Sequence, residues 1–452
     1  MGQGRRVVLF PYPLQGHINP MLQLANILHT KGFSITMIHT NYNSLNSSHY
    51  PQFTFHSIFD GVSETEASKL DTIDLIALIN LRCETPFKDC LAKLLSDNSE
   101  EPIACLISDP TFHFVQGVTD TLHLPKFVLR TSGVLSFLAF AAFPLLRERG
   151  YLPIQDSHLE EAVPELPPLQ VKELPVIDAR DPDAFYQLVS GIVNEGKTSS
   201  GIIWNSIEEL ETLALATLHQ DFSIPMFPIG PFHKYFPAAS SSSSSLLAQD
   251  QTCISWLNRQ QPKSVVYVSF GSIAAISDTE FLEIAWGLAY SKQPFLWVIR
   301  PGLIHGSEWL EPLPKGFLDN VGGKGHIVKW APQLEVLAHP AVGAFWTHNG
   351  WNSTLESICE GIPMICMPFF TDQKVNAKYV THVWRVGLKV GNMGLERGDV
   401  ERTIRKIMVE NEGMEIRERM LNLKEKVNVC LKQGGSSHQA LERLVSYILH
   451  LH

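Results

Sequence analysis

Short apolar runs alternate with longer amphipathic segments along most of the chain. Residues 6–10 (RVVLF) predict a strand, residues 19–32 (NPMLQLANILHTKG) have apolar positions at helical spacing, and residues 33–40 (FSITMIHT) predict a second strand. A strand, a helix and a strand in this order predict a β-α-β unit and therefore a parallel sheet. The apolar run at 103–108 (IACLIS), which ends at Asp109, predicts a further buried strand.

The alternation resumes after a serine-rich stretch near the middle of the chain. Residues 240–245 are six consecutive serines, which cannot pack a core, so we expect a flexible linker there. Beyond it, further elements are predicted: strands at 265–270, 295–300, 326–330, 343–348 and 363–369, and a helix at 278–291. We therefore expect two α/β halves, with boundaries at 1–238, a linker at 239–250, a second domain at 251–435 and a terminal helix at 436–452.

Composition narrows the class of protein. The chain has 452 residues, of which 44% are hydrophobic, and a net charge of −10, so broad attraction to nucleic acid or anionic membranes is not expected. The most apolar stretch, 134–146 (VLSFLAFAAFPLL), is too short to span a bilayer and predicts a buried or pocket-lining helix. Seven scattered cysteines and the lack of a secretory leader favour a reducing compartment, the cytoplasm, and nothing in the sequence demands more than a monomer.

Residues 191–198 (GIVNEGKT) match the phosphate-binding pattern G-x-x-x-x-G-K-[ST]. Such a loop works when a strand precedes it and a helix follows, because the helix start then faces the phosphates. Here residues 181–196 have apolar positions at helical spacing, and residues 199–206 (SSGIIWNS) predict a strand. We therefore expect Lys197 to lie at a helix C-terminus, where a cation is favourable. A nucleotide hydrolase built on this segment remains the alternative, and it requires a strand before Gly191.

A second motif that could bind a ligand is Asp181-Pro182-Asp183, since D-x-D can hold a metal in some sugar transferases. Asp followed by Pro at the start of a helix is also an ordinary N-terminal cap. We prefer the cap and expect no metal site.

The stretch at 330–373 carries the strongest indication of an anion site. A predicted strand ends at His348, Gly350 permits a tight turn, and Asn352 and Ser353 begin a predicted helix. Free N–H groups and the helix dipole favour an anion at such a helix start. The stretch contains no Lys or Arg, so a diphosphate would be held there without a basic clamp. A plain capped helix is the alternative on this pattern alone.

The same 44-residue stretch resembles the C-terminal signature of the plant family-1 UDP-sugar glycosyltransferases, through WAPQ, EVLAH, F-x-THxGWNS, G-x-P and the closing DQ. QGHINP at 15–20, FGS at 270–272 and GGSS at 434–437 extend the resemblance over nearly the whole chain. The overall sequence pattern is similar to that of the subgroup that glucosylates small terpenoids, cytokinins, phenolics and hydroxy acids. The resemblance implies a GT-B fold, with two Rossmann-like α/β domains facing across a cleft: an N-terminal domain for the acceptor and a C-terminal domain for the UDP-sugar. It also implies that the terminal helix packs back on the N-terminal domain.

The resemblance further implies a role for each matching residue in binding the donor, UDP-glucose. Trp330 would stack on uracil, Ala331 and Gln333 would contact the uridine, and Glu356 would accept hydrogen bonds from the ribose. The remaining donor residues would be Ser272, His348, Asn352 and Ser353 at the diphosphate, and Trp351, Asp372 and Gln373 at the sugar. A Gln at position 373, rather than a His, resembles the form of the family that prefers glucose. UDP-xylose and UDP-galactose remain possible donors.

Transfer to a neutral hydroxyl needs a base, and His17 and Asp109 are the candidates. Each follows a predicted strand, His17 in a loop, and parallel strands present such residues at the ligand-binding edge of a sheet. A carboxylate hydrogen-bonded to one imidazole nitrogen fixes the tautomer of the ring. The resemblance implies that His17 is the base and Asp109 its orienting partner. A non-catalytic sugar-nucleotide-binding protein is the other alternative, but it predicts loss of one of the two.

The implied reaction is a single inverting displacement that gives a β-glucoside, without a metal and without a permanently bound cofactor. The acceptor would be a small hydrophobic metabolite with a hydroxyl or a carboxylate, and the sequence leaves transfer to nitrogen open. A carboxylate, already ionised, would need the base less. Residues expected to contact the acceptor are Gly16, Thr131, Ser132 and Phe370.

Overall fold

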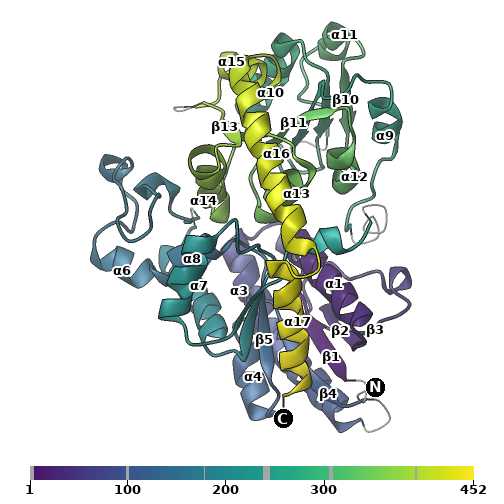
Figure 1. The fold of residues 1–452 in the computed structure, drawn as a ribbon, viewed down its shortest axis with the longest axis vertical. Helices are drawn as coiled ribbons and strands as arrows, with labels where there is room; N and C mark the ends of the chain where they lie inside the picture. Colours follow the sequence, from purple (N-terminus) through teal and green to yellow (C-terminus); the bar gives the residue numbers. More distant parts are fainter. Residues whose placement is uncertain are drawn as a thin grey trace. The chain divides into compact units, whose positions relative to one another are not determined.

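The computed structural model describes residues 5–97, 101–177, 179–237, 245–304, 309–391 and 394–451. The chain forms two compact units (Figure 1). The first comprises Met1–Leu159, Val176–Tyr235 and Cys430–His452, and the second comprises Glu160–Pro175 and Phe236–Val429. Our expected boundaries place residues 160–175 in the N-terminal domain, whereas here they lie with the second unit. The serines at 240–244 of the expected linker lie outside the described residues.

The first unit is built on a parallel sheet with the order β3-β2-β1-β4-β5-β6-β7. Its strands are β1 (Arg6–Phe10), β2 (Ser34–Thr40), β3 (Thr54–Ile58), β4 (Ile103–Ser108), β5 (Lys126–Arg130), β6 (Gly201–Trp204) and β7 (Met226–Pro228). The strands predicted at 6–10, 33–40 and 103–108 are confirmed, because parallel strands buried on both faces consist of short apolar runs.

The helices of the first unit are α1 (Gln15–Thr30), α2 (Glu64–Ala67), α3 (Thr72–Ser96), α4 (Val115–Thr121), α5 (Val134–Ala141), α6 (Phe143–Glu148), α7 (Pro182–Lys197), α8 (Thr212–Asp221) and α17 (Ser436–Leu449). The apolar stretch at 134–146 is two helices rather than the single one expected. Pro144 lies in the first turn of α6, where its missing N–H costs nothing, whereas inside one long helix it would clash with the preceding turn.

The terminal helix α17 packs on the first sheet (Figure 1). Tyr447 contacts the rings of Phe127 on β5 and Phe227 on β7. Arg5 donates a hydrogen bond to the carbonyl of Leu451 at 3.0 Å, so the two ends of the described chain lie together.

The second unit contains a parallel sheet with the order β10-β9-β8-β11-β12-β13. Its strands are β8 (Val265–Ser269), β9 (Phe295–Val298), β10 (Gly325–Val328), β11 (Val342–Thr347), β12 (Met364–Cys366) and β13 (Gly387–Lys389). Its helices are α9 (Thr252–Leu257), α10 (Asp278–Ser291), α11 (Phe317–Val321), α12 (Gln333–Ala338), α13 (Trp351–Glu360), α14 (Asp372–Lys378), α15 (Arg397–Met408) and α16 (Asn411–Leu431). Alternate residues of β8 enter two hydrophobic clusters, Val266 and Val268 in one and Val265 and Tyr267 in the other, so both faces of this sheet are covered.

Each sheet reverses its strand order once. In the first sheet β1 pairs with β2 on one side and β4 on the other, and in the second β8 pairs with β9 and β11. Ligands of open α/β sheets bind outside the carboxyl ends of the strands at such a reversal. His17 and Asp109 follow β1 and β4, while Ser272 and His348 follow β8 and β11, so each pair lies at the reversal of its own sheet.

Candidate active site

His17 lies in the first turn of α1, not in a loop as the sequence pattern suggested. The helix begins at Gln15, before the expected start at Asn19. The pattern misled because Gly16 and Pro20 both disfavour a helix interior, and no side chain caps the helix at Leu14.

The imidazole of His17 contacts the carboxylate of Asp109, with 2.6 Å between Nδ1 and Oδ2. Asp109 also accepts a hydrogen bond from the backbone N–H of Thr111 at 2.9 Å. Burial alone would raise the pKa of Asp109, but the nearby His17 and these hydrogen bonds outweigh burial and lower it. An ionised carboxylate can only accept hydrogen bonds, so Nδ1 of His17 carries the proton and Nε2 is the basic nitrogen.

Exposure differs sharply between the two partners of this pair. The side chain of Asp109 is 1% exposed, whereas that of His17 is 30% exposed. Tyr12, itself buried, packs edge-on against the imidazole with 5.8 Å between ring centroids. A partly exposed ring held by a buried carboxylate has the arrangement of an oriented general base.

The residues expected to contact the acceptor divide between the two units. Gly16 is exposed and adjoins His17 in the first turn of α1. Thr131 and Ser132 directly follow β5, the strand next to β4, and Ser132 accepts a hydrogen bond from Arg130 at 2.8 Å. Phe370 belongs to the second unit and precedes α14.

In the second unit, one hydrogen-bond network joins three of the residues expected to bind the donor. Nε2 of Gln333 donates to Oε2 of Glu356 at 2.7 Å and to Oγ of Ser353 at 3.0 Å. Oε1 of Gln333 accepts a hydrogen bond from the hydroxyl of Tyr267 at 3.2 Å. The four groups fix one another, so α12 and α13 present a preformed polar surface.

Trp330 and Ala331 lie directly before α12. The indole N–H of Trp330 donates to Oγ of Ser245 at 2.9 Å, and its backbone carbonyl accepts from Asp250 at 2.9 Å. Ala331 is buried. These contacts fix the indole just before α12, and the side chain also packs against the hydrophobic cluster that contains Tyr267.

Glu356 is a carboxyl group in an unfavourable environment. Burial raises its pKa to about 7, although the hydrogen bond from Gln333 acts in the opposite direction. A carboxylate with one strong donor can accept further hydrogen bonds, and the two hydroxyls of a ribose would supply them.

His348 lies between two glycines at the end of β11. A Cβ atom on Gly350 would come within 2.5 Å of its Nε2, and one on Gly271 within 2.7 Å of the ring, so a side chain fits at neither position. Burial lowers the pKa of His348 to about 4, so the ring is neutral near pH 7. A neutral ring brings no positive charge to a bound phosphate.

Around the same loop, Ser272 follows Gly271, and Asn352 and Ser353 lie in the first turn of α13 after Trp351, which is buried. The start of a helix carries a partial positive charge, so this is the position at which an anion is expected. Asn349, with a φ of 62° in the left-handed region, makes the turn before Gly350.

Asp372 and Gln373 begin α14. Oε1 of Gln373 accepts hydrogen bonds from the backbone N–H groups of Phe369 at 2.9 Å and Phe370 at 3.4 Å. Asp372 accepts a hydrogen bond from Asn376 at 3.1 Å, and Asn376 also donates to the carbonyl of Asn349 at 2.9 Å. Asp372 is therefore linked through Asn376 to the loop after β11.

The far end of α14 is held by the segment 160–175. Lys378 forms a buried ion pair with Glu173 at 3.0 Å. Sequence reasoning missed this pair and Asn376, since neither lies in a recognisable motif. Asn349 could have been noticed, because Asn before Gly often marks a left-handed turn.

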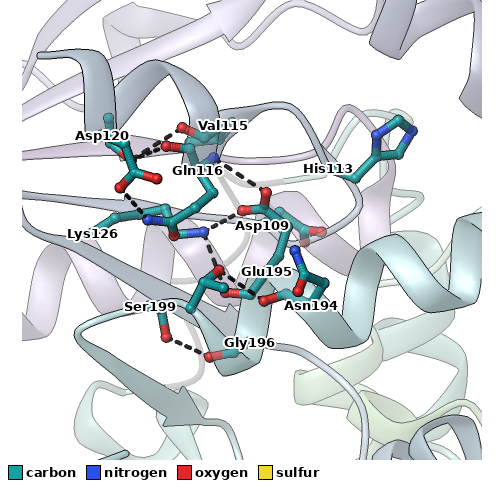
Figure 2. A network of polar contacts seen from close by, with 12 residues as sticks. Asp109, His113, Val115, Gln116, Asp120, Lys126, Asn194, Glu195, Gly196 and Ser199 are labelled. Carbon is teal, nitrogen blue, oxygen red and sulfur yellow. Dashed lines mark hydrogen bonds and ion pairs between the residues drawn. The ribbon is translucent and has the colours of Figure 1, made fainter.

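The GIVNEGKT segment is the end of α7, and β6 follows it, the reverse of the order that a phosphate-binding loop needs. Figure 2 shows the contacts around its glutamate. Glu195 forms a buried ion pair with Lys126 on β5 and accepts a hydrogen bond from the N–H of Gln116 on α4 at 3.2 Å. The glycines serve packing, because a Cβ on Gly191 would lie 3.0 Å from His113 and one on Gly196 3.2 Å from Phe137.

Asp181 is the N-cap of α7, as expected. Its side chain accepts hydrogen bonds from the N–H groups of Asp183 and Ala184. The carboxylate is therefore used within the helix start, which accounts for the D-x-D motif without a ligand.

Replacing Lys197 by alanine is expected to leave sugar transfer within about twofold of the unsubstituted protein. Lys197 ends α7 and lies over the ring of Phe222, 5.0 Å from its centroid, so its loss costs only a surface cation–π contact of about 0.5–1 kcal/mol. Initial rates of UDP release measure this. An ATPase activity that disappears in Lys197→Ala would contradict the assignment of this segment.

The described part of the chain contains no group of three or more His, Cys, Asp or Glu side chains that could hold a metal ion. Within the described ranges, no helix has the length and apolar character needed to cross a membrane.

Comparison with known proteins places the chain in a family. Residues 240–421 match the family model described as UDP-glucoronosyl and UDP-glucosyl transferase. The chain is 54% identical to UDP-glycosyltransferase 76B1 of Arabidopsis thaliana, over 98% of each chain. It is 47% identical to UDP-glycosyltransferase 76G1 of Stevia rebaudiana, over 98% of this chain and 97% of that one.

Solved structures agree with the relatives. A UDP-glucosyltransferase from Polygonum tinctorium capable of glucosylating indoxyl has a TM-score of 0.83 and 30% identity, covering 99% of both chains. Phytolacca americana UGT2, complexed with UDP-2fluoro-glucose and pterostilbene, has a TM-score of 0.82 and 26% identity, covering 99% of this chain and 100% of that one. The expected GT-B fold with two Rossmann-like domains is confirmed. The relatives are named glycosyltransferases, which argues against both alternatives, a nucleotide hydrolase and a non-catalytic binding protein. The chain belongs to the plant family-1 UDP-glycosyltransferases, enzymes that transfer a sugar from a UDP-sugar to an acceptor.

Proposed function

We propose that this enzyme transfers glucose from UDP-glucose to a hydroxyl or carboxylate of a small hydrophobic plant metabolite and inverts the anomeric centre, giving a β-glucoside. The observation that carries the proposal is the 2.6 Å contact between Nδ1 of His17 and the buried carboxylate of Asp109. An oriented, partly exposed imidazole is what a direct displacement needs, because the acceptor oxygen must lose its proton as it attacks.

The proposed step is a single displacement. Nε2 of His17 takes the proton of the acceptor hydroxyl, the acceptor oxygen forms a bond to the anomeric carbon, and the bond from that carbon to the UDP oxygen breaks. Asp109 stabilises the imidazolium that results. UDP leaves with its new negative charge near the start of α13, whose dipole offsets that charge.

The donor residues support UDP-glucose as the sugar nucleotide. Gln333 and Glu356 form a polar surface suited to a uridine, and Asp372 and Gln373 begin the helix proposed to contact the sugar. The Polygonum and Phytolacca proteins named above also act on, or bind, a glucosyl nucleotide. We further propose that no metal takes part and that the enzyme works in the cytoplasm, with which its seven free cysteines agree.

The proposal predicts the product directly. UDP-glucose mixed with a panel of phenols, terpenoid alcohols and hydroxy acids is expected to release UDP and give products one hexose heavier, at a rate that EDTA leaves unchanged. The coupling constant of the anomeric proton identifies the β-linkage. An α-glucoside, or faster turnover with UDP-xylose or UDP-galactose than with UDP-glucose, would contradict the mechanism or the donor respectively.

A further inference from the structure

Arg300 is a buried cation beside the loop proposed to bind the diphosphate. It follows β9, and only 9% of it is exposed. Its guanidinium donates to the backbone carbonyl of Gly271 at 3.1 Å, to that of Pro301 at 3.0 Å, and to that of Ala274.

Arg300 differs in its partners from two other buried cations, Lys126 and Lys378. Lys126 and Lys378 are each paired with a buried carboxylate, Glu195 and Glu173. Among the described residues, no carboxylate forms an ion pair with Arg300, and burial lowers its pKa to about 10 with no acidic group acting against it. It therefore stays charged at neutral pH, and an unpaired buried charge is strongly unfavourable unless an anion approaches it.

The position of this charge indicates which anion that is. The carbonyls that Arg300 holds belong to the loop 271–274, and Gly271 of this loop packs against the imidazole of His348. The charge of Arg300 also contributes to the lowered pKa of His348, after the larger effect of burial. Because His348 is neutral and residues 330–373 contain no Lys or Arg, Arg300 is a cation that can supply positive charge to this loop from outside that stretch.

We propose that Arg300 is a positioning residue of the donor site, whose charge balances the pyrophosphate of UDP while its hydrogen bonds fix the loop 271–274. This rests on the proposed function, because it places the pyrophosphate at Ser272 and His348. Binding would relieve the unpaired charge, and the leaving UDP, which gains negative charge as the glycosidic bond breaks, would be stabilised by the same field.

Two substitutions separate the charge from the hydrogen bonds. Arg300→Gln keeps an amide donor but is neutral, and Arg300→Lys keeps the charge but loses the planar fork that contacts several carbonyls. Dissociation constants of UDP and of uridine, which has no phosphate, are measured by calorimetry for both variants and the unsubstituted protein. We expect Arg300→Gln to weaken UDP by roughly 10- to 100-fold and uridine by less than about threefold, and Arg300→Lys to recover most of the UDP affinity.

Arg417 provides a matched control. Its guanidinium also donates to backbone carbonyls, those of Gly343 at 3.4 Å and Ile407 at 3.2 Å, but Gly343 lies at the opposite end of β11 from His348. Arg417→Gln is expected to lower the melting temperature without changing the ratio of UDP to uridine affinity.

The proposal would be overturned if the Lys and Gln variants lost UDP affinity equally, or if uridine affinity fell in parallel. Arg300 would then only hold the loop 271–274 in place. If Arg300→Gln does not fold, the Arg300→Lys variant alone tests the proposal. A UDP affinity within threefold of the unsubstituted protein supports a role for the charge, and a loss of tenfold or more overturns it. Failure of the unsubstituted protein to bind UDP would overturn the proposed function as well, so the two failures are distinct.

Discussion

Replacing His17 by alanine is expected to lower kcat for phenol and alcohol acceptors by roughly 10²- to 10⁴-fold, the usual contribution of a positioned general base. The substitution removes the imidazole whose Nδ1 lies 2.6 Å from Asp109, so the acceptor oxygen must attack with its proton still bound. The side chain is 30% exposed, so its loss opens no core cavity and the fold should persist. Initial rates at saturating donor and acceptor measure the effect.

Two measurements on the same variant show whether it is the base that has been lost. UDP affinity should stay within about twofold of the unsubstituted protein, because the residues proposed to bind UDP lie in the second unit. A carboxylate acceptor, which is ionised at neutral pH and has no proton to lose, should slow by less than about tenfold. An equal loss for hydroxyl and carboxylate acceptors would contradict the role of His17 as a base.

Asp109→Asn tests the orienting role in the same assay. An amide can donate to Nδ1 and so favour the tautomer that carries its proton on Nε2, which cannot act as a base. We expect the rate with hydroxyl acceptors to fall by about 10²-fold or more, with UDP affinity again unchanged. A variant as active as the unsubstituted enzyme would show that the contact with Asp109 does not control the imidazole.

Much of the fold could be predicted because its signals are local. The helix at 278–291 has the predicted limits, since Ser277 and Glu280 form a capping box at its start and Lys292 ends it in the left-handed region. The start of α1 was missed because Gly16 and Pro20 carry the opposite local signal. Residues 160–175 lie with the second unit through contacts such as the Glu173–Lys378 ion pair, which join positions distant in sequence and give no periodic pattern.

The candidate site divides in the same way. His17, Asp109 and the residues at 330–373 could be named because they lie in motifs or at strand ends. The protonation states of these residues could not be predicted from the sequence. The neutral His348 and the raised pKa of Glu356 follow from burial, which depends on the complete fold. Arg300 was visible only as the last residue of a predicted strand, and its contacts with the loop 271–274 depend on the pairing of β8 with β9.

Replacing Glu356 by glutamine is expected to weaken UDP binding by roughly 100-fold, because hydrogen bonds from the ribose to a charged acceptor contribute about 1.5–3 kcal/mol each and the amide is neutral. Calorimetric titration with UDP measures this. Glu360→Gln is the control: Glu360 ends the same helix, α13, and lies near Lys424 at 3.7 Å, so UDP affinity should not change. A UDP affinity in Glu356→Gln within threefold of the unsubstituted protein would remove Glu356 from the site.

The raised pKa of Glu356 makes stability and affinity respond to pH in opposite directions. Between pH 4.5, the ordinary value for the carboxyl, and its folded-state pKa of about 7, the folded protein holds a proton that the unfolded chain has lost. The stability of the ligand-free enzyme should therefore fall as pH rises through this interval, by up to about 3 kcal/mol, and level off above it. UDP requires the ionised carboxylate, so the affinity of the enzyme for UDP should rise over the same interval.

Glu356→Gln has no proton to lose. Chemical denaturation at pH 5 and pH 8 should therefore show a smaller loss of stability in this variant than in the unsubstituted enzyme, and the affinity of the variant for UDP should depend less on pH. If both proteins had the same pH dependence, Glu356 would already be ionised in the ligand-free enzyme, which would contradict its raised pKa.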